Sequence, residues 1–430
     1  MNYQDFKKKI NNKLIIFLIF YLTILIGFYF DEDALGGANH DFLLHYRIVE
    51  RFNINFFETF KNFGDREMDL GTRNSPIFWI ILSFFNKLIS IDVLRAINTI
   101  VSLLIGFSLF KCLKLKFKNQ SEISLILLTS IIFLSPTVRA LSIWPYNQIW
   151  GLLFFILSIF YFLKFKESSN IHIKIGLSLK FLFFLILSSY IHPSFAIFII
   201  YYAFHLFYEF KVSKYLIYLI LYCLFLSIPF FLYVSSLDIL EIFYGAEGVD
   251  VNVSQSLNVS NKIIIIFTML LFFILPLINL RKIFFEIKSI QLAPLLITIS
   301  ISFICIYFFN FPYFDGGSFG GGFFHKFSNI LFNNNFLLYF IFIISLIMIY
   351  LILFKEKKLN NLILLIILIL SNPQFTIYNK YFDPLIFIIF LTLFEFDIKK
   401  HFFEKKYRYL QLYLISVSYF IMALLKPYVL

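Results

Sequence analysis

The stretch KKKINNKLIIFLIFYLTILIGFYFDEDALGGANHDFLLHYRIVERF, from Lys7 to Phe52, shows the pattern that decides the fold: lysines, then an apolar run, then a charged loop. The run from Leu14 to Phe30 approaches the ~20 apolar residues with which a helix crosses a bilayer. The lysines before it favour a cytoplasmic N-terminus, because positively charged loops stay inside. Since no small-residue cleavage site follows, we expect a retained first transmembrane helix and not a removed signal peptide.

The composition of the whole chain indicates the same class of protein. Of 430 residues, 60% are hydrophobic, 21% aromatic and only 14% charged, whereas soluble domains carry about 25% charged residues. The net charge of +12 is expected to come from lysines in cytoplasmic loops and not from nucleic-acid binding. Cys112, Cys223 and Cys305 lie in or beside apolar runs, without the paired spacing of a disulfide, redox or zinc site.

Apolar runs recur along the chain and predict an all-α polytopic membrane protein with about 13 transmembrane helices in a single integral membrane domain, residues 1–430. The runs lie near 14–30, 94–110, 122–135, 149–163, 175–190, 194–210, 215–234, 263–280, 290–309, 336–354, 361–371, 384–395 and 409–425. All the lysine-rich loops can be cytoplasmic if one short segment, 76–86 (PIFWIILSFFN), does not cross the membrane. We interpret that segment as an interfacial or re-entrant helix.

This topology places five loops on the outer face, at 31–75, 137–148, 235–261, 310–335 and 371–384. The first is the longest and the richest in charge, so we take residues 31–90, with the interfacial segment, as the candidate catalytic region. Asp31, Glu32 and Asp33 follow the first span directly. They are either part of a site or simply a charge cluster on the outer surface.

An amphipathic surface helix is predicted to begin at Asp41, with Asp41, His45 and Ile48 on one face. Asp41 would lie at or just before the N-terminus of this helix, where a carboxylate is stabilised. It could be only an N-cap. Its neighbours favour a functional role, because the same loop carries Arg73 beside the apolar segment 76–86. A site for a lipid-linked sugar phosphate needs cations for the phosphate and a carboxylate as a base.

The segments HDFLLHYRIVERF and TRNSPIFWIILSFFN resemble the first outer loop of the GT-C membrane glycosyltransferases, which use sugars on polyprenyl-phosphate or polyprenyl-diphosphate carriers. The resemblance covers about the first 110 residues and continues as a similarity of topology. It implies surface-lying helices in the first periplasmic loop and an active site at the outer face of a bacterial cytoplasmic (inner) membrane. The Trp-Trp-Asp signature and soluble C-terminal domain of oligosaccharyltransferases are absent from the sequence.

The resemblance assigns the catalytic base to Asp41 or Asp33, and Asp41 is favoured. The base would deprotonate an acceptor hydroxyl that attacks the anomeric carbon, with inversion. The partners implied are a polyprenyl-phosphate-linked donor and a glycan, lipid or protein acceptor. A divalent cation, Mg²⁺ or Mn²⁺, is used by some relatives and not by others. The remaining substrate-binding candidates of the first loop are Glu32, His40, His45, Arg47 and Arg73.

Later outer segments supply further candidates for the donor phosphate. Tyr378, Lys380 and Tyr381 could form a cation and tyrosine cluster, or a turn with interfacial anchors. Lys326 follows the glycine-rich stretch DGGSFGGGFFHKF and could contact an anion. Arg139 could pair with phosphate, and His192 could orient a hydroxyl or serve as a turn element. The triplets at Asn252 and Asn258 match glycosylation acceptors.

Alternative functions remain open at this stage. The segment 141–207, around Tyr190 and His192, is similar to polysaccharide polymerases of the Wzy or EpsG kind, although these would need arginines in the later outer loops. A transporter or lipid flippase is the alternative of another class. It is disfavoured because charged residues are almost confined to loops and span ends. A structural membrane protein is the fourth possibility.

Overall fold

The computed structural model describes residues 3–63, 70, 75–234, 258–287, 292–313, 320–354, 359–372, 376–396, 402–403, 405 and 407–429. These residues are mainly helical, and the only pairing of strand type among them is an isolated bridge between Gly320 and Ile377. The chain divides into two compact units. Unit 1 holds residues 1–238 and 416–429, and unit 2 holds residues 239–415 with residue 430. The all-α class predicted from the sequence is confirmed.

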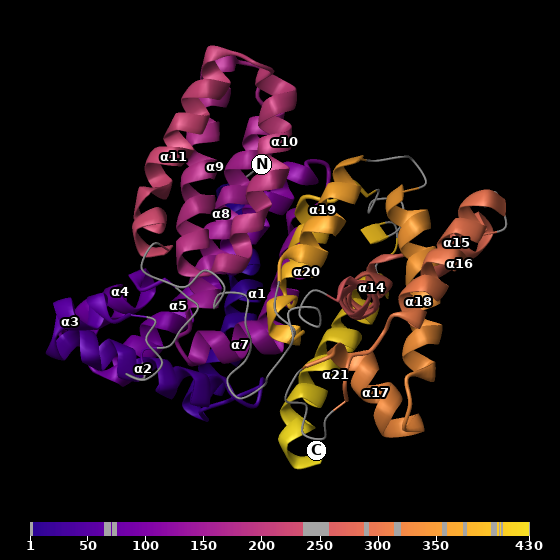
Figure 1. The fold of residues 1–430 in the computed structure, drawn as a ribbon, viewed down its shortest axis with the longest axis horizontal. Coiled ribbons are helices and arrows are strands. Elements are labelled where there is room, and N and C mark those ends of the chain that lie inside the picture. The colour runs from indigo at the N-terminus through magenta and orange to yellow at the C-terminus, as the bar shows by residue number, and fades with distance from the viewer. Residues whose placement is uncertain are drawn as a thin grey trace. The chain divides into compact units, whose positions relative to one another are not determined.

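Unit 1 contains a group of long helices, with shorter ones gathered at one end (Figure 1). Its helices are α1 (Tyr3–Tyr29), α2 (Ala38–Ile54), α3 (Phe56–Lys61), α4 (Ile77–Asn86), α5 (Ile91–Lys116), α6 (Glu122–Ser130), η1 (Ile131–Leu134), α7 (Pro136–Ile143), α8 (Asn147–Glu167), α9 (Ile171–Ile191), η2 (Pro193–Phe198), α10 (Ile199–Phe210) and α11 (Lys214–Val234). Helix α9 packs along both α8 and α11, while α2 packs against α4.

Unit 2 is built around α14 (Val259–Ile274), which contacts most of the other helices of the unit. The others are η3 (Leu275–Leu277), α15 (Leu280–Ile287), α16 (Leu292–Tyr307), α17 (Gly322–Phe332), α18 (Phe336–Ile349), the π-helical η4 (Tyr350–Phe354), α19 (Leu359–Leu370), η5 (Asn379–Tyr381) and α20 (Leu385–Thr392). Helix α21 (Tyr407–Val429) begins in the unit 2 range and ends in the unit 1 range.

The termini of the long helices carry the signals expected from their sequences. Helix α5 begins after Ser90, whose Oγ accepts a hydrogen bond from Val93 N, and its last turn contains Lys114 and Lys116. Such a cap satisfies one of the unpaired N–H groups of the first turn, and the lysines complement the negative end of the helix dipole. Local sequence therefore explains where this span starts and stops.

Eight described helices are long and apolar enough to cross a membrane, or nine if the pair 122–134 and 136–143, bent by 65°, forms one span. A multi-pass membrane protein is thus supported, and the count of 13 stays a prediction, since only the described residues give the present number. The run 384–395 is one predicted span that the structure does not support. Its helix α20 has eight residues, about 12 Å at 1.5 Å per residue, against about 30 Å of hydrocarbon. Every residue of α20 is buried, so its apolar character serves protein packing.

One other local expectation differs from the structure. The segment 137–148, predicted as an outer loop, is largely helical, because it forms the buried helix α7 and the start of α8. Ser135 caps α7 through Val138 N, and Pro136 occupies its first turn. The segment 76–86, in contrast, forms the ten-residue helix α4, too short to span, as predicted.

Candidate functional site

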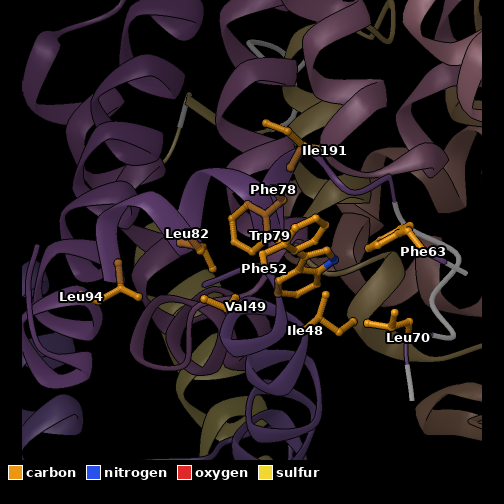
Figure 2. Close-up of a cluster of buried hydrophobic side chains, with 10 residues drawn as sticks. All are labelled: Ile48, Val49, Phe52, Phe63, Leu70, Phe78, Trp79, Leu82, Leu94 and Ile191. Carbon is orange, nitrogen blue, oxygen red and sulfur yellow. The ribbon is translucent and has the colours of Figure 1, made fainter. Parts of the chain in front are cut away.

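The first candidate region is the packing of α2 on α4 in unit 1. In Figure 2, Ile48, Val49 and Phe52 of α2 gather with Phe78, Trp79 and Leu82 of α4 in one apolar cluster. The cluster also contains Phe63, Leu70, Leu94 and Ile191. Burial of a large apolar side chain stabilises by roughly 1.5–3 kcal/mol. The cluster therefore holds α2 and α4 in a defined arrangement.

Polar contacts add to this packing at His45 and Tyr46. The His45 ring stacks on Trp79 with centroids 4.8 Å apart and an interplanar angle of 17°. Tyr146, which precedes α8, brings its Oη to 3.5 Å from His45 Nε2. Tyr46 Oη donates to Asn86 Oδ1 over 2.5 Å. These contacts connect α2 to the end of α4 and to the start of α8.

Asp41 lies in the first turn of α2, which begins three residues earlier, at Ala38, and not at Asp41 as predicted. Positions 41, 45 and 48 share a helix face, and His45 and Ile48 on that face pack with Trp79. Asp41 is therefore a partly buried carboxylate one turn before His45, on the side of α2 that faces α4. The positive end of the α2 dipole stabilises its charge.

Asp33, the second candidate base, is engaged by the backbone. Its Oδ1 accepts from Gly36 N over 3.0 Å, and its Oδ2 accepts from Asn39 N over 3.1 Å. Gly37, the residue at the N-terminus of α2, has no side chain to cap the helix. Asp33 supplies this cap from the preceding turn, where Gly36 has φ of 69°. The predicted capping role thus belongs to Asp33 and not to Asp41.

Glu32 and Arg139 form a buried ion pair in which Arg139 uses all five of its N–H donors. Nε and Nη2 donate to the two carboxylate oxygens of Glu32 over 2.7 and 2.5 Å. The other donors reach Thr23 Oγ1, Thr23 O and Phe133 O. A Cβ on Gly27 would lie 2.5 Å from Glu32 Oε2, so Gly27 makes room for the pair. This geometry favours a structural role for Arg139 over phosphate binding.

Asp31 also forms an ion pair, with Arg95, which we did not predict from the sequence. Arg95, near the start of α5, donates through Nη2 to Asp31 Oδ1 over 2.5 Å, and its guanidinium lies 3.8 Å from the Trp144 ring centroid. A charged residue inside an apolar run is a signal that could have found it. Asp31, Glu32 and Asp33 are therefore each bound to the protein, and do not form an unpartnered surface cluster.

The remaining candidates of unit 1 differ in position. His40 and Arg47 are exposed on α2. Arg73 lies outside the described residues, as do Asp65, Arg66, Glu67 and Asp69. His192 is buried between α9 and η2, with Nδ1 2.6 Å from Ser194 Oγ, a geometry that fits the turn alternative.

In unit 2 the structure brings together two segments that the sequence suggested separately. Gly320 pairs with Ile377 in a parallel bridge, and Gly321 N donates to Ile377 O over 2.9 Å. Gly320 has φ of +89°, and a Cβ there would lie 2.2 Å from Ile377 O, so this pairing requires glycine. The glycine-rich stretch thus lies beside the segment that carries Tyr378 and Lys380.

Tyr378, Lys380 and Tyr381 form the predicted cation and tyrosine cluster. The Lys380 ammonium lies 5.5 Å from the Tyr378 ring centroid and 5.9 Å from that of Tyr381. The two rings pack edge to face at 5.9 Å. Such contacts are cation–π interactions, and they hold the charge of Lys380 at one place in the turn η5.

Three further residues of unit 2, on α17 and α14, extend what the sequence suggested. Lys326 is partly buried on α17, as a continuation of the glycine-rich stretch. His325 beside it is buried among aromatic rings, and burial together with the neighbouring Lys326 charge lowers the pKa of His325 to about 4. Lys262, in the first turn of α14, is only 5% exposed. The sequence interpretation named neither His325 nor Lys262, although a lysine directly before an apolar run can mark a site.

Of the two glycosylation triplets, the structure describes the asparagine of one, Asn258. Asn258 is the N-cap of α14, and its Nδ2 donates to Asn310 Oδ1 over 2.7 Å and to Phe308 O over 3.2 Å. Its amide is therefore used within the fold. Asn252 lies outside the described residues. Among the residues that the structure describes, no group of three His, Cys, Asp or Glu side chains is placed to hold a metal ion.

Comparison of the chain with protein families, with curated proteins and with solved structures finds no match in any of the three.

Proposed function

We propose that the chain is an integral membrane glycosyltransferase that moves a sugar from a polyprenyl-phosphate-linked donor to a glycan, lipid or protein acceptor, at the outer face of a bacterial cytoplasmic membrane. The observation that carries the proposal is the position of Asp41. It is a partly buried carboxylate one turn before His45, whose ring packs on Trp79 and Tyr146. Glu32 and Asp33 have other roles in the fold.

In the proposed reaction, Asp41 accepts the proton of the acceptor hydroxyl while the hydroxyl oxygen bonds to the anomeric carbon. The bond from that carbon to the phosphate oxygen breaks, and the lipid phosphate leaves with the electron pair. A single displacement inverts the anomeric centre. General-base catalysis of this kind contributes roughly 10²–10⁴-fold to the rate.

Within unit 2, considered by itself, Lys380 and its two tyrosines stay a candidate contact for a phosphate. Lys380 is held between Tyr378 and Tyr381, and an ammonium is a suitable point charge for a phosphate. A polysaccharide polymerase would be expected to carry arginines in these later segments. In the described segments that we predict to be outer, the candidate cations of unit 2 are lysines, which favours a glycosyltransferase. Nothing in the described geometry favours a transporter over an enzyme.

The test measures release of polyprenyl phosphate from a panel of polyprenyl-phosphate sugars by membranes that contain the chain. Asp41→Asn should reduce release of polyprenyl phosphate by about 10²-fold or more, because the amide cannot accept the proton. The amount of protein in the membrane should be unchanged. Glu50→Gln, an exposed carboxylate on the same helix, is the matched control and should retain release.

Full release by Asp41→Asn would remove Asp41 from the reaction. Absence of release from every donor of the panel by the unsubstituted chain, relative to membranes without it, would contradict the proposed activity.

A further inference from the structure

His325 is a buried polar ring that lacks hydrogen-bond partners. It is 1% exposed, and the rings of Phe309, Phe311 and Tyr313 meet it edge-on at 5.9, 5.4 and 5.9 Å. Within the described part of the chain, neither of its ring nitrogens is hydrogen bonded. Its Nδ1 lies 2.5 Å from the position of a Cβ on Gly321. The Nδ1 edge of the ring therefore lies against Gly321, the residue that directly precedes α17.

The N-terminus of α17 offers backbone donors at this place. The helix has eleven residues, and Gly321 before it, with φ of +90°, supplies no capping side chain. The N–H groups of the first turn have no partners within a helix, and the dipole makes this end positive. Such a terminus is a favourable site for an oxyanion.

A buried cation lies on the helix that packs against this terminus. Lys262 is 5% exposed and has no ion pair among the described residues. The Cβ position of Gly322 lies 3.1 Å from Ile265 Cγ2 and 2.9 Å from Met269 Cε, both on α14. Residues three and seven positions apart share a helix face, so Lys262 lies on the stripe of α14 that meets the start of α17.

Lys262 is also unfavourably placed without an anion. A positive charge in the first turn of a helix is opposed by the helix dipole, and a buried charge without a partner is strongly destabilising. The low pKa of His325, about 4, leaves its ring neutral near pH 7. The ring can then donate one hydrogen bond, while the compensating charge comes from the ammonium of Lys262.

We propose that a compact oxyanion of the phosphate type binds at the N-terminus of α17, with Lys262, His325 and the first-turn N–H groups of α17 as its partners. The anion could be free phosphate or the phosphate of a lipid headgroup, since both present the same oxygens. The inference goes beyond the proposed function, because it concerns binding within unit 2 and holds whether or not the chain transfers a sugar.

The experiment uses the full chain purified in an uncharged detergent and a phosphate-free buffer. Inorganic phosphate and dioleoyl phosphatidic acid are titrated separately, with dioleoylglycerol as the lipid that lacks the phosphate, and binding is followed by the rise in Tm. Lys262→Met and His325→Phe should each weaken binding ~10-fold or more, as expected for loss of a charge-assisted or buried hydrogen bond. Lys262→Arg should retain most of the binding. Lys164→Met, an exposed lysine at the end of α8, is the control.

A response to inorganic phosphate identifies a free anion, and a response to phosphatidic acid alone identifies a headgroup. The proposal is overturned if the unsubstituted chain responds to neither probe, or if Lys262→Met binds as tightly as the unsubstituted chain. If Lys262→Met does not fold, unaltered affinity of His325→Phe overturns it in the same titration. Because no sugar transfer is measured, these outcomes are separate from those for Asp41.

Discussion

At the scale of single residues, several charged groups of unit 1 hold the fold. Glu32, Asp33 and Arg139 all seemed candidates for substrate contact, yet their polar atoms are bonded within the protein. Asp41 lies on the face of α2 where His45 packs on Trp79. The proposed choice of Asp41 as the base depends on this position.

The buried pair Glu32–Arg139 leads to a prediction on stability. Glu32→Gln should lower the free energy of unfolding by roughly 3–5 kcal/mol, because it leaves a buried guanidinium without its charge partner. Thermal unfolding of the detergent-solubilised chain measures the effect. Glu167→Gln is the matched control. Its pair with Lys118 spans 3.1 Å at the surface, and such pairs contribute about 0–1 kcal/mol. An equally small effect of Glu32→Gln would show that Arg139 does not depend on this carboxylate.

At the scale of elements, apolar character and spanning length do not coincide. Helix α11 and helix α20 are both strongly apolar, but α11 has 21 residues with many exposed side chains and α20 has eight, all buried. Hydropathy indicates only that the side chains of a segment are apolar. Whether lipid or protein surrounds it depends on its neighbours, which explains why the apolar run 384–395 does not form a spanning helix.

The bridge between Gly320 and Ile377 is the element-scale feature open to direct test. Gly320→Ala should destabilise the pairing by roughly 1–3 kcal/mol, because an L side chain resists positive φ and its Cβ would overlap Ile377 O. The measurement is the midpoint of thermal unfolding together with proteolysis of the intact chain. Gly176→Ala in α9, where nothing lies within 4 Å of the new Cβ, is the control and should be neutral or stabilising by up to about 1 kcal/mol. Equal behaviour of both variants would contradict the importance of the bridge.

At the scale of the whole molecule, the distribution of charge predicts the topology. The last turns of α5 and α8 contain lysines, namely Lys114, Lys116, Lys164 and Lys166. The positive-inside rule expects such residues at cytoplasmic helix ends. A reporter fused after Lys116 should therefore be active in the cytoplasm. One fused after Asn252, a position outside the described residues, should be active on the outer side. Reversal of either signal would invalidate the topology and the outer location of Asp41.

The sequence by itself determined the class of the protein, the extent of most long helices and the short helix within 76–86. These follow from local properties, namely apolar runs, caps such as Ser90 and terminal lysines, which act within a few residues along the chain. It also singled out Asp41, Lys380 and the glycine-rich stretch, because those residue types are unusual beside spans.

Only the tertiary structure decided how those residues are used. It paired Glu32 with Arg139, placed Gly320 beside Ile377, and left His325 and Lys262 buried where α17 meets α14. These relations join positions far apart in the chain. The cost of burying a charge or a ring nitrogen depends on which partners the fold brings to it, and hydropathy along a single chain contains no information about those partners.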